Sequence, residues 1–337
     1  MKPYTIGILL ALVLGLIAYI FIGYVLKKQW TGLPTYDKSD AQERYVTFWG
    51  WLGLLIVPLT LAVGGFWFNY TQHQNDRKLE EARNKHELHI QELRAQDAAF
   101  QAYLDRMGTL LVERNLSAKT PGTAESNLAT AYTAALLDAA SPQYKRSALR
   151  FLYNTELIVE DEEKVDLDHT DLTHASLNHI YLQNAELEAV NLDYAHLSDA
   201  YLKSANLYNS DLHDANFDSA ILSDSELTGV SLRNANLHYS DLTGAHLVSV
   251  DLRGANLSES DLTNVDLRAK LEDSFGQLRP TRLADANFKG ALLDGTNLSG
   301  LDLSQAKNLT QDQIKQADGN SSTQLPPKLN RPAAWTE

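Results

Sequence analysis

Apolar side chains follow two different patterns along the chain, and the pattern in the carboxy-terminal half has a period of five. Leucine or phenylalanine occupies every fifth position from Leu167 to Leu267, 21 consecutive positions, with a small or β-branched residue two positions before each. A step of five residues advances about 140° around an α-helix, so these leucines would point in every direction. Along a flat strand they would alternate between the two sides. A single apolar side requires a bend within every unit, and the period therefore predicts a solenoid with a core of stacked leucines.

The residues of this repeat also show a family resemblance. Units such as Ala205-Asn206-Leu207 and Ala255-Asn256-Leu257 follow the pattern A(D/N)LXX, and residues 167–267 resemble the pentapeptide-repeat family. The resemblance implies a mainly β solenoid, a right-handed quadrilateral β-helix with four units per coil. The register breaks at 268–282 and resumes afterwards, so we expect the solenoid to occupy residues 161–309. The resumed core positions are Phe288, Leu293, Leu298 and Leu303.

Two long apolar runs in the amino-terminal part contain no charged residue. They cover residues 6–26 and 46–68, and about 20 helical residues span the roughly 30 Å of a bilayer core. Pro58 within the second run is compatible with a transmembrane helix. We therefore expect residues 1–70 to form a two-span hairpin in the lipid bilayer, with both ends of the chain on the same side.

Further residues resemble a subgroup of the family. Trp51–Pro58, Gln101–Leu104 and Arg150–Tyr153 are similar to segments of bacterial membrane-anchored pentapeptide-repeat proteins, cyanobacterial ones especially. The resemblance implies an integral, two-pass membrane protein with a cytoplasmic solenoid. The lysine and arginine residues on the two sides of the predicted spans leave the orientation open.

Residues 71–160 are predicted to form a helical stalk and linker. A helix over 71–116 begins with a charged part and continues with a stripe of core-type positions in alternating steps of three and four. This stripe would pack either on a partner helix or within the chain. Its length of only about three heptads favours packing within the chain over an intermolecular coiled coil. Two shorter helices are predicted over 124–140 and 142–154. The stripe consists of Ile90, Leu93, Asp97, Phe100, Leu104, Met107 and Leu111.

The last segment, residues 310–337, is predicted to cover the open end of the solenoid. Thr310 and Gln313 have the spacing of a capping box, which indicates the start of a short helix. A proline-containing tail follows. Solenoids require such a cover over their terminal coil.

Candidate catalytic and metal-binding groups are few. The chain has no cysteine, which excludes thiolate metal sites and cysteine nucleophiles. The segment His86-Glu87-Leu88-His89 is one residue short of the H-E-x-x-H zinc spacing, and its charged surroundings favour a solvated helix face. His169, His174 and His179 are five apart and would lie on successive sides of the solenoid. We therefore expect no catalytic residue, no cofactor-binding or metal site, no cofactor and no enzymatic activity.

The formal net charge of −14 lies entirely on the predicted solenoid. Residues 165–267 contain 17 acidic and three basic residues, and the rest of the chain is balanced. The favoured interpretation of this acidic excess is that aspartate and asparagine are suited to the solvated corners of the coils. The alternative is an acidic surface that recognises a partner. With four units per coil, two outward columns are expected: Asp166, Glu186, Asn206, Glu226, His246 and Asp266, and Ser176, His196, Asn216, Asn236 and Asn256. The basic residues of 268–282 would either bind a partner or fold back onto the acidic coils.

These patterns favour a membrane-tethered, non-enzymatic scaffold that presents a rigid acidic solenoid to a protein partner, which the sequence does not identify. The alternative is a DNA-mimic-type modulator of a nucleic-acid enzyme such as a topoisomerase, because the acidity resembles that of some soluble members of the family. Direct nucleic-acid binding is not expected of an acidic surface. Within the solenoid, Leu212 is expected to point inward and Asp211 outward.

Overall fold

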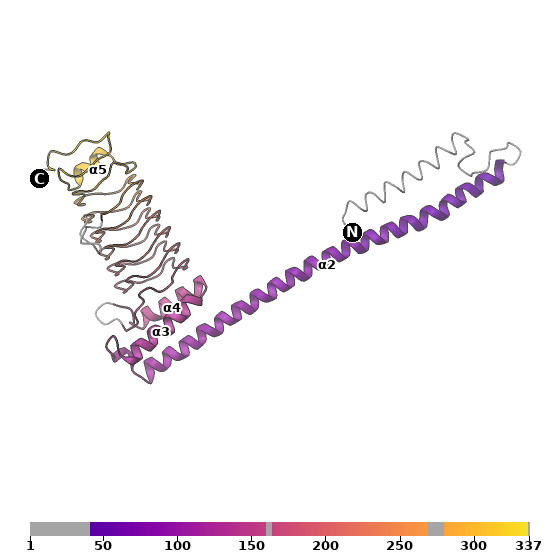
Figure 1. Ribbon diagram of the computed structural model, residues 1–337, viewed down its shortest axis with the longest axis horizontal. Coiled ribbons are helices and arrows are strands. Elements are labelled where there is room, and N and C mark those ends of the chain that lie inside the picture. Colours follow the sequence, from indigo (N-terminus) through magenta and orange to yellow (C-terminus); the bar gives the residue numbers. More distant parts are fainter. Residues whose placement is uncertain (1–40, 160–163, 269–279, 336–337) are drawn as a thin grey trace. The chain divides into compact units, whose positions relative to one another are not determined.

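The computed structural model describes residues 41–159, 164–268 and 280–335, with side chains described from residue 58 onward (Figure 1). The chain divides into two compact units, residues 1–88 and 89–337. The helices are α2 (Ala41–Val112), the 3₁₀ turn η3 (Leu116–Ala118), α3 (Ala124–Ala139), α4 (Pro142–Asn154) and α5 (Gln311–Gln316).

Helix α2 corrects the prediction of membrane spans. Across the residues that the structure describes, no helix offers an apolar stretch of the length that a bilayer crossing needs. Polar and charged residues follow Phe68 in α2, from Asn69 onward. The other expected span, 6–26, lies outside the described residues. The prediction of two transmembrane helices and of an integral two-pass membrane protein is therefore wrong for the described chain.

The last part of α2 packs against α3 and α4, as expected for packing within the chain. Met107 is fully buried, and Tyr103 and Leu110 are almost so. The Tyr103 hydroxyl lies 3.1 Å from the Thr133 hydroxyl of α3, and its ring meets Phe151 of α4 edge-on at 5.9 Å. The buried face thus includes Tyr103 and Leu110, which the expected stripe omitted, because α3 and α4 approach α2 from that side.

Residues 165–268 and 280–324 form the solenoid, in which every described coil stacks on the next. Parallel bridges join residues 20 positions apart, such as Asn191 with Asp211 and Asn216 with Asn236. Since each unit has five residues, a coil contains four units, as the family resemblance implied. Asp251 pairs with Arg282, 31 positions on instead of 20, so the inserted segment adds 11 residues and the stacking then resumes in register.

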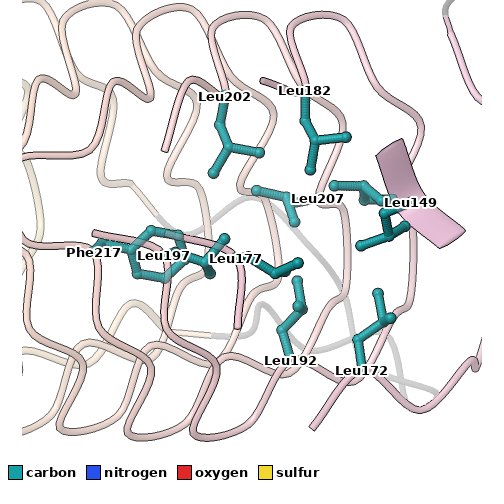
Figure 2. Close-up of a pocket in the computed structure, with 10 residues that line it drawn as sticks. Leu149, Leu172, Leu177, Leu182, Leu192, Leu197, Leu202, Leu207 and Phe217 are labelled. Carbon is teal, nitrogen blue, oxygen red and sulfur yellow. The ribbon is translucent and has the colours of Figure 1, made fainter. Parts of the chain in front are cut away.

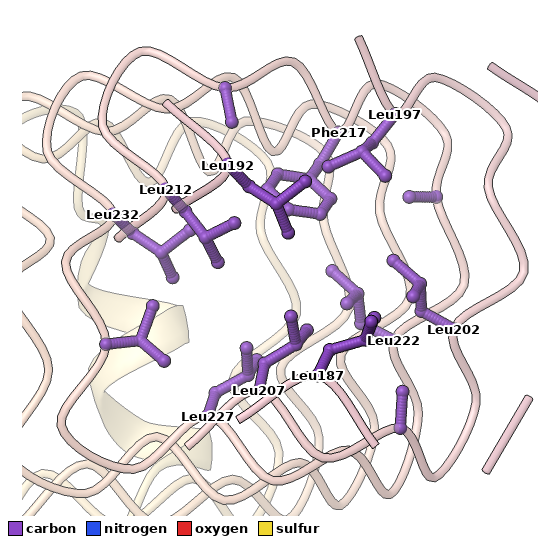
Figure 3. Packing of buried hydrophobic residues seen from close by; sticks show 14 of the residues in the cluster. Leu187, Leu192, Leu197, Leu202, Leu207, Leu212, Phe217, Leu222, Leu227 and Leu232 are labelled. Carbon is purple, nitrogen blue, oxygen red and sulfur yellow. The ribbon is translucent and has the colours of Figure 1, made fainter. Parts of the chain in front are cut away.

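The leucines fill the inside of the coils, as the period predicted. Leu212 is fully buried, and Leu192 and Leu232 occupy the same place one coil before and one coil after it (Figure 3). Phe217 and Phe288 are the largest side chains that are fully buried. The space between the leucines of the first coils is apolar and too narrow for a water molecule (Figure 2).

Helix α4 covers the first coil of the solenoid. Leu149 enters the leucine stack beside Leu172 (Figure 2). The buried Lys145 ammonium group donates hydrogen bonds to Asp171 Oδ1 and to the Thr173 carbonyl, both at 3.2 Å. The ion pair and the apolar contact therefore fix the helix on the coil edge.

The other end is covered by α5 and the tail. Thr310 and Gln313 form a capping box at the start of α5, and the Gln313 amide donates to the Phe288 and Ala291 carbonyls at 2.7 and 2.8 Å. The buried Trp335 indole donates to the Ala317 carbonyl at 2.9 Å. These contacts attach the cap to carbonyl groups at this end of the solenoid and cover its edge.

Candidate interaction surface

The solenoid has four outward faces, which we name after one central leucine of each: the Leu187, Leu192, Leu197 and Leu202 faces. Residues 20 positions apart share a face, so side chains at equal places in the repeat form columns. Both predicted columns are present except for Asp166, which is not bridged to Glu186: Val159 pairs with Ala185 at this place, and the Glu186 N–H donates to the Ile158 carbonyl at 2.8 Å. Glu186, Asn206, Glu226, His246 and Asp266 are bridged in succession on the Leu187 face, and Ser176, His196, Asn216, Asn236 and Asn256 on the Leu197 face.

In most units, the residue immediately before the leucine stabilises the turn by a hydrogen bond between its side chain and the backbone. Its side-chain oxygen accepts a hydrogen bond from the backbone N–H two residues on, as Asp241 does from Thr243 at 3.0 Å. Asparagines of the Leu197 face also bond to one another between coils: the Asn236 amide donates to Asn216 at 2.9 Å and the Asn256 amide to Asn236 at 3.0 Å. Much of the Asp and Asn content therefore holds turns and coils together, in agreement with the favoured interpretation.

Several carboxylates are paired with cations. Asp251 pairs with Arg253 at 2.6 Å and with Arg282 at 3.7 Å, and Asp266 pairs with Arg268 at 2.9 Å. Burial raises the pKa of Asp251, but the hydrogen bonds from Arg253 and the charges of both arginines outweigh it and lower that pKa. Arg268 and Arg282 thus fold back from the ends of the predicted basic segment onto acidic coils, while residues 269–279 lie outside the described residues.

A second group of carboxylates, on the first two coils of the Leu187 face, lies next to other acids. It consists of Asp166, Asp168, Glu186 and Glu188. Desolvation, followed by the negative charges of Asp168, Glu186 and Asp166, raises the pKa of Glu188. Desolvation and then the charge of Asp166 raise the pKa of Asp168, which His169 only partly offsets. The electrostatic potential of this acidic group therefore attracts positively charged side chains.

Aromatic side chains, one exposed and two half-buried, form a column on the neighbouring Leu202 face. The tyrosine column consists of Tyr153, at the end of α4, and Tyr181 and Tyr201, on the first two coils. The Tyr181 and Tyr201 rings stack in parallel, with centroids 4.7 Å apart and planes 6° apart, and Tyr153 meets Tyr181 edge-on at 5.8 Å. Tyr181 is 51% exposed. The 20-residue spacing of Tyr181 and Tyr201 would have revealed this pair from the sequence, but the contact with Tyr153 required the position of α4.

The histidines do not form a metal site. Among the described residues, no group of histidine and carboxylate side chains is arranged to hold a metal ion. His169, His174 and His179 lie on successive faces, as expected, and His174 instead stacks on Tyr194 at 5.1 Å. His86 and His89 are exposed on the charged part of α2.

The family comparison agrees with this geometry. The model described as pentapeptide repeats matches in eight copies, over residues 166–200, 195–234, 231–268 and 277–310. Residues 166–268 and 277–310 are pentapeptide repeats. No curated protein matches it.

Solved structures similar to this pentapeptide-repeat protein include one from the Arabidopsis thaliana thylakoid lumen, with 25% identity over 43% of this chain and 77% of that one, at a TM-score of 0.24. Rfr23, from the cyanobacterium Cyanothece, has 20% identity over 46% and 90% of the two chains, at a TM-score of 0.25. QnrB1, a plasmid-mediated fluoroquinolone resistance protein, has 16% identity over 50% and 92%, at a TM-score of 0.31. At such TM-scores these likenesses say nothing about function.

Proposed function

We propose that this pentapeptide-repeat protein is a non-enzymatic scaffold whose solenoid binds a protein partner through its first coils. The observation that carries the proposal is the tyrosine column. Tyrosine is enriched at the centres of protein interfaces, where its ring supplies contact area and its hydroxyl a hydrogen bond. Aromatic rings clustered at a surface mark interaction sites more often than singly scattered rings do.

The coil stack suits this task because it holds the tyrosines in fixed positions. The backbone N–H of Leu182 donates to the Tyr201 carbonyl at 2.8 Å, and the N–H of Tyr201 donates to the Ile180 carbonyl at 2.8 Å. The rings are therefore ordered before a partner arrives, which lowers the entropic cost of binding.

The proposal is tested by photo-crosslinking in cells with the full chain. A benzophenone amino acid replaces Tyr181 in one variant and Tyr239 in the control. Tyr239 is 61% exposed but lies on the Leu197 face, outside the column. We expect a crosslinked protein from position 181 that is absent from position 239. Equal products from both positions, or none from position 181, would refute a partner at the column.

The second candidate is a DNA-mimic-type modulator of a nucleic-acid enzyme such as a topoisomerase, favoured by the excess of carboxylates on residues 165–267. The ion pairs of Asp251 and Asp266 and the uncharged asparagine column interrupt this acidity, which supports the scaffold instead. A gyrase supercoiling assay with the full chain separates the two: loss of supercoiling at stoichiometric protein favours mimicry, and unchanged supercoiling favours the scaffold.

A further inference from the structure

The tyrosine column and the acidic group lie on adjacent faces of the same coils. The chain passes from Tyr181 on the Leu202 face to Glu186 on the Leu187 face within one unit, and from Tyr201 to Asn206 in the next coil. The Tyr181 hydroxyl donates to Gln183 Oε1 at 2.8 Å, on the side of the ring that leads to this corner. We name Tyr181, Tyr201, Asp168, Glu186 and Glu188 the aromatic–acidic corner.

The corner differs from other acidic parts of the solenoid in how its charges are balanced. Elsewhere, Asp171 pairs with Lys145 at 3.2 Å and Asp285 with Lys307 at 2.9 Å. At the corner, Glu186 instead accepts a hydrogen bond from the uncharged Asn206 amide at 2.6 Å. After desolvation, the charges that raise the pKa of Glu188 and of Asp168 are those of other carboxylates. The negative charge of the corner is therefore not neutralised by these neighbours, and a cationic side chain of another protein can pair with it.

Arginine matches this combination of groups better than lysine does. Its planar guanidinium donates paired hydrogen bonds to a carboxylate, packs against aromatic rings and is less strongly hydrated than an ammonium group. Tyr181 and Glu186 are five residues apart in the chain, a separation that spans at most about 18 Å, so an extended segment of about five residues is long enough to contact both.

We propose that the aromatic–acidic corner binds an extended, arginine-containing segment of the partner protein, with arginine side chains packed against Tyr181 and Tyr201 and paired with Asp168, Glu186 and Glu188. This inference rests on the proposed function and names the chemistry of the partner.

The test measures fluorescence anisotropy of a short labelled peptide of arginine-glycine-serine triplets with the full chain, beside the same peptide with lysine for arginine. We expect the arginine peptide to bind and the lysine peptide to bind more weakly. The double variants Tyr181→Ser/Tyr201→Ser and Asp168→Asn/Glu188→Gln should each weaken arginine-peptide binding on the order of tenfold.

The matched control is Asp218→Asn/Glu259→Gln, which removes the same formal charge from the Leu197 face and should leave the affinity within about twofold, since exposed charges at a distance are screened. An equal loss in the control, equal binding of both peptides, or no binding would overturn the inference. If position 181 still crosslinks a partner that the arginine peptide does not displace, the inference fails while the proposed function stands.

Discussion

In nearly every described repeat, the residue two positions after the central leucine has a left-handed backbone conformation, and this determines the cost of substitutions there. Examples are Ala189, Asp214 and Gly244, with φ of 50°, 56° and 69°. This conformation costs most L-residues about 1–2 kcal/mol, while glycine, asparagine and aspartate adopt it more readily. The prevalence of Asn, Asp, Ser and Gly at this place follows from the turn and is no sign of a binding site.

We predict that Ala189→Gly stabilises the solenoid by up to about 1 kcal/mol, the opposite sign to most alanine-to-glycine changes, because relief of the left-handed strain exceeds the entropy that glycine adds to the unfolded chain. Hydrogen–deuterium exchange of peptides around residue 189, in the full chain, gives the local free energy of opening. The control, Ala195→Gly at a fully buried position, should destabilise by about 1 kcal/mol or more. Faster exchange in Ala189→Gly would contradict the assignment.

Two aspartates on the Leu192 face are predicted to respond to pH with opposite sign. The pKa of Asp251 is lowered from its ordinary 3.8, so its ion pairs stabilise the fold above that value and are lost as the pH falls through the lowered pKa. Desolvation, and then the charge of Asp211, raise the pKa of Asp193 above 3.8. The contribution of Asp193 to stability therefore declines as the pH rises from 3.8 through the raised pKa.

At neutral pH, Asp251→Asn should destabilise the fold by about 1 kcal/mol. Asp193→Asn should be neutral or slightly stabilising, since an amide oxygen can still accept the His213 N–H that Asp193 holds at 2.8 Å. Chemical denaturation at pH 7 and below pH 4 measures both effects, and each should shrink at the lower pH. If both variants destabilised the fold by a similar amount at pH 7, the opposite pKa shifts assigned to Asp251 and Asp193 would be wrong.

At the scale of elements, the coil is held by leucines that contact only the coils next to them. Leu212→Ala should cost on the order of 2–5 kcal/mol, because a fully buried side chain leaves a cavity that neighbouring coils fill only in part. The loss should concentrate in nearby coils. Asp211→Ala should change stability by no more than about 0.5 kcal/mol, since it removes a like charge near Asp193.

Peptide-resolved hydrogen exchange of the full chain distinguishes these two variants. Faster exchange limited to the coils that contain Leu192, Leu212 and Leu232 is expected for Leu212→Ala. Exchange equal to that of the unsubstituted chain, or greater damage from Asp211→Ala, would show that the inward and outward positions are assigned wrongly.

The contact between α4 and the first coil depends on Lys145. Lys145→Ala should loosen α4 by about 1–3 kcal/mol, because it removes two hydrogen bonds and leaves the Thr173 carbonyl without this donor. Hydrogen exchange of residues 142–154 should rise while that of the middle coils stays unchanged. Equal acceleration throughout the solenoid would mean that the helix is part of the core and not a separate cover.

At the scale of the whole molecule, the sequence predicted the solenoid because a strict period of five permits only a bent chain, and the family resemblance supplied the four units per coil. The tyrosine column escaped prediction because it joins residues from α4 and two coils. Packing of α2 through Tyr103 and Leu110 escaped as well, since a periodic stripe does not say from which side other helices approach. The membrane spans were inferred from uncharged length alone, and no helix in the described part of the chain is long and apolar enough to cross a membrane.

All columns, including the aromatic–acidic corner, depend on residues 20 positions apart lying on one face. The chain has no cysteine, so introduced pairs test this cleanly. Asn216→Cys/Asn236→Cys replaces two side chains joined at 2.9 Å on coils about 4.8 Å apart, within the distance of a disulfide. In oxidised full-length protein, this pair should form the bond quantitatively, and the pair Asn216→Cys/Ser231→Cys, 15 positions apart on different faces, should remain reduced. Oxidation of the second pair and not the first would contradict the four-unit coil and every column built on it.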